Sequence, residues 1–318
     1  MKPKLIVHIG TNKTGTSSIQ HHLKMNRELF RDQGVCYPGL GEDVAAHHVI
    51  ADWARHTNKF KKEIAALKQE IADYPVTILS SEALCDLREP AALKTMFPDH
   101  EISIILYLRD PVRYLVSWWQ QDIQMGDEFL NLSFYLTQKR RSYLELINTW
   151  EDVFGRDALN LRLYSRHALP KGNVLDDFLG TTDLADIEDQ KRLNWENNPS
   201  ISGNLLFFKL LYNSFRLPYA RSNDMIMGLT EASKKKMDFR VVPAVPEPLA
   251  QTTRGLYEQE LEIIQKTYGL EIPVSPFIAG VSVPDRKCLK ADFELLCDNF
   301  DVEDFPLLKL REVMTFVK

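Results

Sequence analysis

The chain has few cysteines and carries no export or membrane signal. Its 318 residues include four cysteines, none in a C-x-x-C pair or with the spacing of metal ligands: Cys36, Cys85, Cys288 and Cys297. This usage is typical of reduced thiols in a cytoplasmic protein. No positively charged leader with an apolar core opens the sequence, and no uninterrupted apolar run is long enough to span a bilayer. We therefore expect neither a signal peptide nor an integral membrane segment.

Basic residues are outnumbered by acidic ones. Lys and Arg number 39 against 44 Asp and Glu, which leaves a formal net charge of -5. This balance argues against a nucleic-acid partner. The basic clusters at 139–141 and 234–236 are short and flanked by acids, and we predict that both are solvated helix faces. Internal repeats and low-complexity tracts are absent as well.

Hydrophobic residues make up 44% of the sequence, which is enough for a full core. In the first half of the chain, strand patterns alternate with helical ones, which predicts an α/β fold: a central, mostly parallel sheet flanked by helices. The predicted strands cover 5–9, 76–79, 102–108 and 159–164. The predicted helices cover 14–33, 44–73, 132–154, 174–179, 201–215 and 247–268, with another from 305 onward. We expect a single domain over 1–318, with an α/β core at 1–180 and a mainly helical extension at 181–318.

The most informative stretch is 5–20, LIVHIGTNKTGTSSIQ. An apolar run typical of a buried strand breaks at Gly10 into a loop of small residues, and a helix opens after Gly15, which is the layout of a phosphate-binding loop. Glycine takes backbone conformations that β-carbons forbid, so the amides between the two glycines can point inward at an anion. Four hydroxyls lie at the start of the helix, where N–H groups lack partners and the dipole is positive: Thr14, Thr16, Ser17 and Ser18.

The position of the lysine distinguishes this loop from that of the nucleotide triphosphatases. Their pattern is G-x-x-x-x-G-K-[ST], whereas here Thr16 occupies the lysine position and Lys13 lies in the body of the loop. A lysine there lies beside the bridging oxygen of a terminal group instead of clamping its outer oxygens. The alternative to an anion site is a strand-to-helix turn that is merely rich in small residues.

A carboxylate and two histidines are further candidates for chemistry. Glu82 follows the strand 76–79, and ligands of an open parallel sheet bind beyond the carboxyl ends of its strands. The alternative is that Ser80 or Ser81 caps a helix and Glu82 complements its first turn. His47 and His48 lie near the start of a predicted helix, either as surface or capping residues or as residues that contact substrate and handle protons.

The strand 102–108 leads into a second candidate anion site. It delivers Arg109 to the same edge of the sheet, after which Asp110 caps a helix that starts at Pro111. Ser117 follows roughly two turns into that helix. A guanidinium fork and a hydroxyl on a rigid element can hold an anion that is distinct from the one at the first loop.

Taken together, the two loops resemble those of the sulfotransferases that use 3'-phosphoadenosine 5'-phosphosulfate (PAPS). The segment 10–17 is similar to their 5'-phosphosulfate loop, and Arg109-Asp110-Pro111 with Ser117 resembles their 3'-phosphate motif. The likeness continues through 161–164 and the helix that ends at 178–180, a segment that the family places beside the nucleotide. It covers the first 180 residues and looks most like the bacterial branch.

The resemblance implies transfer of a sulfuryl group to a hydroxyl or amine of an acceptor by in-line displacement. The acceptor would be a small molecule or a glycan, with carbohydrates and glycoconjugates among the candidates, and we expect the helical extension to shape its pocket. Lys13 would neutralise the bridging oxygen, so that adenosine 3',5'-bisphosphate leaves, and no metal would be required. The implied donor-binding residues are Thr11, Asn12, Lys13, Thr14, Gly15, Thr16, Ser17, Ser18, Arg109, Ser117 and Tyr164. The implied general base is Glu82, with His47 or His48 as the second choice and as substrate contacts.

Some features depart from the family. Ile19 stands near the place where many animal members have a tryptophan that stacks on adenine, and 234–240 is a poor substitute for a late loop of basic residues and glycine. The alternatives are a phosphate-binding-loop kinase, which should carry a lysine at position 16 and a magnesium-binding aspartate, or a non-catalytic nucleotide-binding protein. The oligomeric state is open. Aromatic residues of the second half could line an acceptor pocket or form core: Trp195, Phe207, Phe208, Tyr212, Phe215 and Tyr219.

Overall fold

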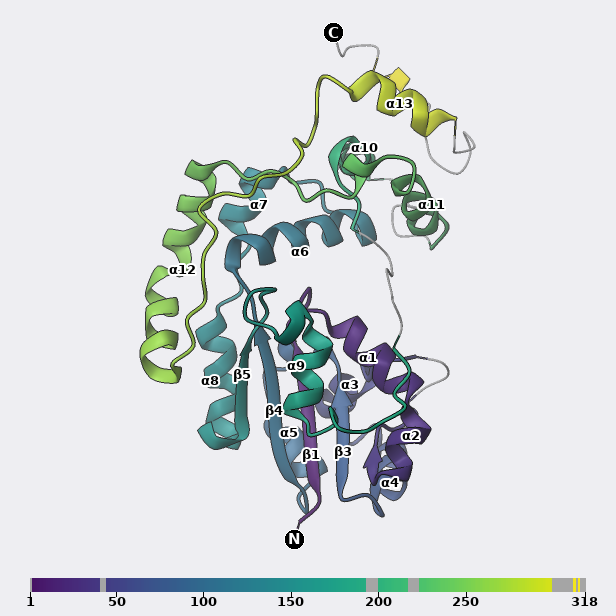
Figure 1. Ribbon diagram of the computed structural model, residues 1–318, viewed down its shortest axis with the longest axis vertical. Coiled ribbons are helices and arrows are strands. Elements are labelled where there is room, and N and C mark those ends of the chain that lie inside the picture. The colour runs from purple at the N-terminus through teal and green to yellow at the C-terminus, as the bar shows by residue number, and fades with distance from the viewer. Residues whose placement is uncertain are drawn as a thin grey trace. The chain divides into compact units, whose positions relative to one another are not determined.

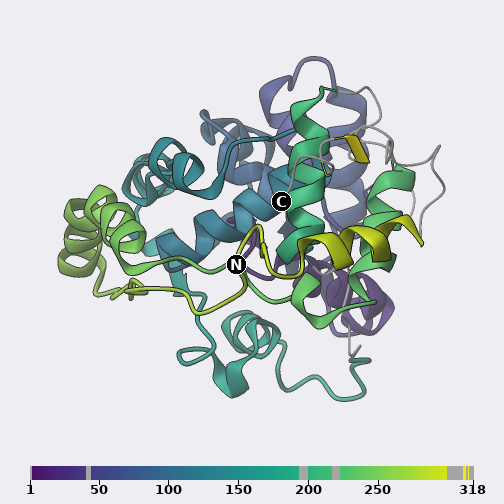
Figure 2. The same cartoon turned by 90° about the horizontal axis from the view of Figure 1, so that it is seen from above.

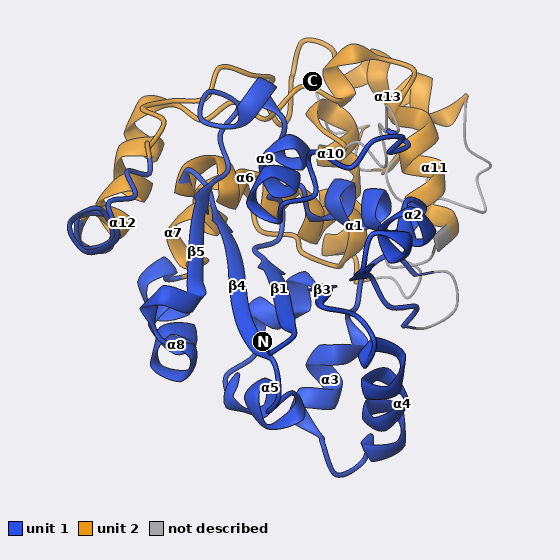
Figure 3. Cartoon of the chain, turned by 60° about the horizontal axis from the view of Figure 1, so that its bottom comes forward, with its two compact units in different colours: residues 1–110, 142–195, 259–272 blue, residues 111–141, 196–258, 273–318 orange. Residues whose placement is uncertain are grey.

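The computed structural model describes residues 2–40, 44–192, 200–216, 223–298, 311, 312 and 314. The chain forms two compact units, each built from three stretches of sequence (Figure 3). The sheet unit consists of Met1–Asp110, Ser142–Trp195 and Gln259–Ile272. The helical unit consists of Pro111–Arg141, Glu196–Glu258 and Pro273–Lys318.

A five-stranded parallel sheet is the centre of the sheet unit (Figure 1), which confirms the predicted α/β class. The strands are β1 (Lys4–Gly10), β2 (Val35–Cys36), β3 (Val76–Ser80), β4 (Glu101–Leu108) and β5 (Leu159–Leu163), in the order β2-β3-β1-β4-β5. From β1 the chain moves to one side for β2 and β3, and then to the other side for β4 and β5. The strand order therefore reverses at β1, and a ligand crevice is expected beyond its carboxyl end.

Helices cover both faces of this sheet because side chains of alternating strand residues point to opposite faces. On one face, Ile6 of β1 packs with α1 (Thr16–Met25), α2 (Arg27–Asp32) and α9 (Val174–Thr181). On the other face, Leu5 and Val7 pack with a second set of helices. These are α3 (Val49–Arg55), α4 (Lys61–Ile71), α5 (Ala91–Met96) and α8 (Tyr143–Phe154). Three short 3-10 helices complete the unit: η1 (Glu82–Asp86), η2 (Arg156–Ala158) and η3 (Pro170–Gly172).

The helical unit has its own hydrophobic core. Its helices are α6 (Pro111–Met125), α7 (Leu132–Gln138), α10 (Gly203–Ser214), α11 (Asn223–Ser233), η4 (Met237–Phe239) and α13 (Leu289–Cys297). Helix α12 (Glu247–Tyr268) begins in this unit, and its residues from Gln259 onward belong to the sheet unit. Trp119, Phe208 and Phe293 join α6, α10 and α13 in the core, and Figure 2 shows α13 in yellow near the green α10. None of the described helices combines the length and the apolar character needed to cross a bilayer.

A buried lysine donates hydrogen bonds to carbonyl groups at the carboxyl end of α6. Lys209, fully buried on α10, donates hydrogen bonds to the carbonyl oxygens of Ile123 and Gly126 at 3.0 Å each, and to the side-chain oxygen of Asn213. The last carbonyls of a helix have no partner within it, and a cation is favourable there. The ammonium group therefore stabilises the packing of α10 against α6.

We expect Lys209→Met to lower the free energy of unfolding by roughly 1–3 kcal/mol, because the carbonyl oxygen of Gly126 and the side-chain oxygen of Asn213 lose the ammonium donor, while the carbonyl of Ile123 keeps only the Asn213 amide. Urea unfolding would measure the loss. Lys290→Met, at an exposed position in the first turn of α13, is the matched control and should change stability by less than about 0.5 kcal/mol. Equal stabilities of the two variants would contradict this role of Lys209.

Several predicted helices are divided in the structure. The helix predicted over 14–33 is broken at Asn26, whose side-chain amide donates to the carbonyl oxygens of His22 and Lys191 at 3.0 Å each. Asparagine competes in this way with helical hydrogen bonds. The segments 44–73 and 132–154 each form two helices, whereas α12 matches its prediction. The predictions missed α5, α11 and α13, and the helix predicted from 305 starts outside the described residues.

The two basic clusters were predicted to be solvated helix faces; Arg140, Lys234 and Lys235 are exposed as expected, but neither cluster lies on a helix. Residues 139–141 form the connection between α7 and α8, where their cations lie over aromatic rings. The charge of Arg141, for example, lies 5.3 Å from the centre of the Trp118 ring. Residues 234–236 follow the end of α11, and Lys236 is paired with Asp292 at 2.9 Å. Stacking and pairing of this kind depend on the tertiary fold.

The aromatic residues of the second half belong mainly to the core. Phe208 and Tyr212 are buried in it, and Phe207 and Phe215 pack against it. Trp195 and Tyr219 lie outside the described residues. Core packing therefore explains four of the six aromatic residues that were considered for an acceptor pocket.

Candidate active site

The loop after β1 has a sharply turned backbone. Gly10, Lys13 and Gly15 all have positive φ, at 86°, 63° and 79°. Gly15 directly precedes α1, and no side chain caps the first turn of this helix. The first N–H groups of α1 are therefore not taken by a cap, and such a helix end is suited to an anion.

Each glycine also permits a close approach. A β-carbon on Gly10 would lie 2.9 Å from the β-carbon of Glu82. One on Gly15 would lie 2.6 Å from Val174 and 3.2 Å from the ring of Tyr164. Because real β-carbons do not come so near, the two glycines allow η1 and the start of α9 to pack directly against the loop.

Hydroxyl groups hold the loop in shape. The Thr11 hydroxyl donates to the carbonyl oxygen of Tyr107 at 3.2 Å, and the Thr14 hydroxyl donates to the carbonyl oxygen of Thr11 at 2.6 Å. Thr11, Thr14 and Thr16 are buried, and Asn12 is half-buried. Ser17 and Ser18 are exposed in the first turn of α1. The resemblance assigned all of these residues to donor binding. Thr11 and Thr14 also stabilise the loop through their hydrogen bonds.

Two cations and an aromatic ring meet beside the loop. The Arg109 guanidinium donates to the carbonyl oxygen of Lys13 at 2.9 Å and lies 5.4 Å from the centre of the Tyr164 ring. Tyr143 donates to the carbonyl oxygen of Arg109 at 2.8 Å. Burial, followed by the charge of Arg109, lowers the pKa of Lys13. In the described part of the chain no carboxylate pairs with the Lys13 ammonium, so the charge balance at this end of the loop favours an anion.

Glu82, the first residue of η1 after β3, belongs to a second polar group. Its Oε2 accepts a hydrogen bond from the Gln20 amide at 2.9 Å, and its Oε1 lies 3.9 Å from Nε2 of His48. Nδ1 of His48 lies 2.8 Å from the Ser81 hydroxyl, which accepts a hydrogen bond from the backbone N–H of Ala83. Ser81 thus caps η1, as one interpretation of the sequence had it, and Glu82 also meets two polar side chains.

His47 differs from its neighbour. Its ring is fully buried, Nε2 donates to the carbonyl oxygen of Pro38 at 3.0 Å, and Nδ1 accepts from the backbone N–H of Ser80 at 3.2 Å. Burial lowers the pKa of His47 to about 3. With both nitrogens engaged inside the protein, the side chain does not reach a substrate, and only exposed His48 keeps the predicted role of a substrate contact.

The sequence analysis did not select a third histidine, His8, which contacts residues next to the site. His8, fully buried in β1, places Nδ1 2.8 Å from the Ser80 hydroxyl, and its ring lies against Tyr107 and Phe178. Burial lowers its pKa to about 3. Gln20 was missed too. The sequence shows a histidine within an apolar strand and a glutamine on the buried side of α1. Neither pattern indicates which side chain the residue contacts.

The remaining predicted donor residue, Ser117, lies on α6 in the helical unit and is half-buried. Its predicted role in holding a 3'-phosphate with Arg109 stays a prediction. No three His, Cys, Asp or Glu side chains in the described ranges gather as the ligands of a metal ion would.

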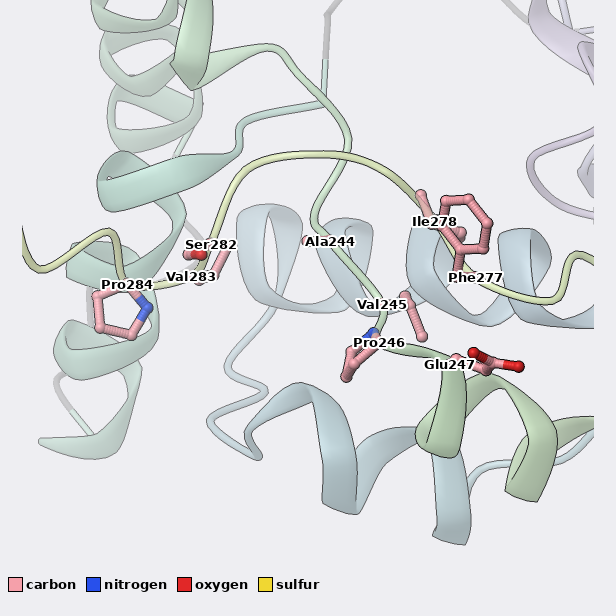
Figure 4. Close-up of a pocket in the computed structure, with 9 residues that line it drawn as sticks. All are labelled: Ala244, Val245, Pro246, Glu247, Phe277, Ile278, Ser282, Val283 and Pro284. Atoms are coloured by element: carbon pink, nitrogen blue, oxygen red, sulfur yellow. The ribbon is translucent and has the colours of Figure 1, made fainter.

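The helical unit contains a hollow of about 560 Å³ (Figure 4). Two segments form it, joined by mutual backbone hydrogen bonds of 3.0 Å between Val245 and Ile278. Its lining is mostly apolar: Ala244, Val245, Pro246, Glu247, Phe277, Ile278, Ser282, Val283 and Pro284. Its size lies within the range of small-molecule pockets, but its only charged lining group is Glu247.

Comparisons with known proteins give a partial likeness. No family model matches the chain. An uncharacterized protein of Archaeoglobus fulgidus is 30% identical over 127 residues, which are 39% of this chain and 34% of that protein, so the chain spans about a third of the length of this relative. A crystal structure of a sulfotransferase from Alicyclobacillus acidocaldarius is similar over 71% of this chain and 96% of that chain, with a TM-score of 0.40 and 17% identity. A likeness this distant does not assign a family.

Proposed function

We propose that the protein is a sulfotransferase that moves a sulfuryl group from PAPS to a hydroxyl or amine of an acceptor. The observation that carries the proposal is Lys13, held at positive φ in the loop, beside Arg109 and with no carboxylate partner among the described residues. Glu82 supports it from the next strand end, where a base would be needed.

In this proposal, each part of the donor has its own residues. Amides and hydroxyls from Thr11 to Ser18 would hold the 5'-phosphate at the start of α1. Arg109, whose charge lies over the Tyr164 ring, would hold the 3'-phosphate. Lys13 would lie beside the bridging oxygen.

The reaction is an in-line displacement at sulfur. The acceptor oxygen or nitrogen forms a bond to sulfur, the bond from sulfur to the bridging oxygen breaks, and the acceptor proton passes to Glu82. The Lys13 ammonium stabilises the charge that develops on the bridging oxygen, so that adenosine 3',5'-bisphosphate leaves. Because a sulfuryl group carries less charge than a phosphoryl group, the proposal requires no metal ion.

The proposed function includes the location of the enzyme and the class of its acceptor. We expect a cytoplasmic protein that acts on a small molecule or a glycan, and a net charge of -5 disfavours nucleic acid as its acceptor. Carbohydrates and glycoconjugates are the first acceptors to test.

Arg109→Ala tests the donor site. We expect it to weaken binding of adenosine 3',5'-bisphosphate by about 10- to 100-fold, because a charge-assisted contact to the 3'-phosphate is lost. Binding of adenosine 5'-monophosphate, which lacks that phosphate, should change less than about threefold. Calorimetry with both ligands measures the difference.

Arg55→Ala is the matched control, since Arg55 is an exposed residue of α3 that pairs only with Asp52 among the described residues. It should bind both ligands like the unaltered protein. Equal losses for the two ligands in Arg109→Ala would mean that Arg109 does not contact the 3'-phosphate.

A further inference from the structure

We infer that Gln20 is a positioning residue that fixes Glu82, so that the acceptor hydroxyl binds between Oε1 of Glu82 and Nε2 of His48. The inference rests on the proposed function and makes it more specific. It assigns a pair of side chains, instead of a single base, to the acceptor, and it names the acceptor's reacting group.

The first step is the hold on Glu82. Gln20 is only 3% exposed, and its amide Nε2 donates to Glu82 Oε2 at 2.9 Å. A buried amide N–H needs an acceptor, and Oε2 of Glu82 provides it, so the bond keeps Oε2 turned toward α1. The β-carbon of Glu82 is itself held against the loop, 2.9 Å from where a β-carbon on Gly10 would lie. Fixed at both ends, the carboxylate presents Oε1 as its remaining oxygen.

The second step is the hold on His48. The Ser81 hydroxyl lies 2.8 Å from Nδ1 and already accepts a hydrogen bond from the Ala83 N–H at 3.2 Å. Its own proton is then free to be donated to Nδ1, which leaves the proton of the neutral ring on Nε2. The helix α3, which starts directly after His48, limits movement of the backbone.

The third step is the gap between the two groups. Oε1 and Nε2 are 3.9 Å apart, which is too far for a direct hydrogen bond. One oxygen atom can lie within hydrogen-bond distance of both. The side chains of His48 and Glu82 are 49% and 23% exposed, so an acceptor can reach them from solvent.

The arrangement selects a hydroxyl. A hydroxyl can accept a hydrogen bond from Nε2–H while donating its proton to Oε1. A reacting amine must be neutral, and its single lone pair cannot accept from Nε2–H while it bonds to sulfur, whereas a hydroxyl oxygen has a second lone pair. As the acceptor oxygen bonds to sulfur, its proton passes to Oε1, and the bridging oxygen departs with adenosine 3',5'-bisphosphate. We therefore expect alcohols and water, not amines, to serve as acceptors.

The test follows radiolabelled sulfur from PAPS to water, to glycerol and to ethanolamine. Gln20→Leu should lower kcat for transfer to glycerol by about tenfold while the affinity for adenosine 3',5'-bisphosphate stays within about twofold. In a Glu82→Gln background, the same change should have almost no further effect, because the carboxylate that it positions is gone. Labelled ethanolamine should carry the sulfuryl group on oxygen. Gln69→Leu, an exposed change on α4, is the matched control.

Four results would overturn the inference. The first is an unchanged kcat in Gln20→Leu, and the second is a loss in the double variant that equals the product of the two single losses. The third is a protein that binds the bisphosphate but transfers the sulfuryl group to neither water nor glycerol. The fourth is transfer to the nitrogen of ethanolamine. Failure to bind the bisphosphate is a separate result, which would overturn the proposed function and the inference with it.

Discussion

Lys13→Ala is expected to lower turnover of PAPS by about a thousandfold, while the affinity for adenosine 3',5'-bisphosphate falls by less than about tenfold. The reason is that the Lys13 ammonium acts on charge that appears only as the bridging oxygen departs. Its neighbours Arg109 and Tyr164 stay in place to hold the nucleotide. Turnover is measured by release of labelled sulfate, and affinity by calorimetry.

Backbone strain has to be separated from the loss of charge. Lys13 has φ of 63°, a conformation that asparagine adopts more readily than alanine. Lys13→Asn should therefore keep the loop and still lose turnover to the same extent. Lys62→Ala, at an exposed position on α4, is the control for removal of a lysine and should behave like the unaltered protein. Near-normal turnover of either Lys13 variant would contradict the assigned mechanism.

The second large effect is a loss of stability in mild acid. His8 and His47 are fully buried, and burial lowers the pKa of each from 6.5 to about 3. The unfolded chain takes up protons at these residues below about pH 6.5, whereas the folded protein does not. Their contribution to stability is therefore complete above that pH and is lost as the pH falls toward 3. Each histidine should cost about 2 kcal/mol at about pH 5, or about 4 kcal/mol together.

Urea unfolding between about pH 7.5 and 5 tests this expectation. His47→Gln should be less stable at the higher pH, since the glutamine cannot repeat both hydrogen bonds of the ring. It should also lose about 2 kcal/mol of the change in stability between these pH values, and the part that remains includes the contributions of His21, His22 and His100, whose pKa values burial also lowers. His56→Gln, at an exposed position after α3, is the control and should keep the full dependence. A free energy of unfolding that does not change over this range would contradict the buried, neutral state of the two rings.

The parts of the site that depend on local order along the chain could be predicted from the sequence. An apolar run followed by Gly10 and Gly15 specifies a strand, a turn and a helix, and all three are present. Strand ends in a parallel sheet meet at one edge, so Glu82 and Arg109 could be assigned to the edge that also carries the loop. The α/β class follows from the same alternation of patterns.

Contacts between distant segments could not be predicted. His47 and His48 are neighbours in sequence, yet one is buried between Pro38 and Ser80 while the other faces Glu82. The Gln20 contact joins residues 62 positions apart, and no local pattern indicates it. Asn26 breaks a helix through a bond to Lys191, a partner that only the fold supplies. The predicted single domain with a division at 180, and the part of Ser117 in the site, stay predictions.

The central claim, a donor site for PAPS, is tested most directly by calorimetric titration of the purified protein with adenosine 3',5'-bisphosphate in the absence of magnesium. ADP and ATP, each with and without magnesium, are the comparison ligands. We predict tight, magnesium-independent binding of the bisphosphate and much weaker binding of ADP and ATP. A preference for ATP with magnesium would contradict the claim in favour of a kinase, and no binding of any of these nucleotides would leave the two loops as structural turns.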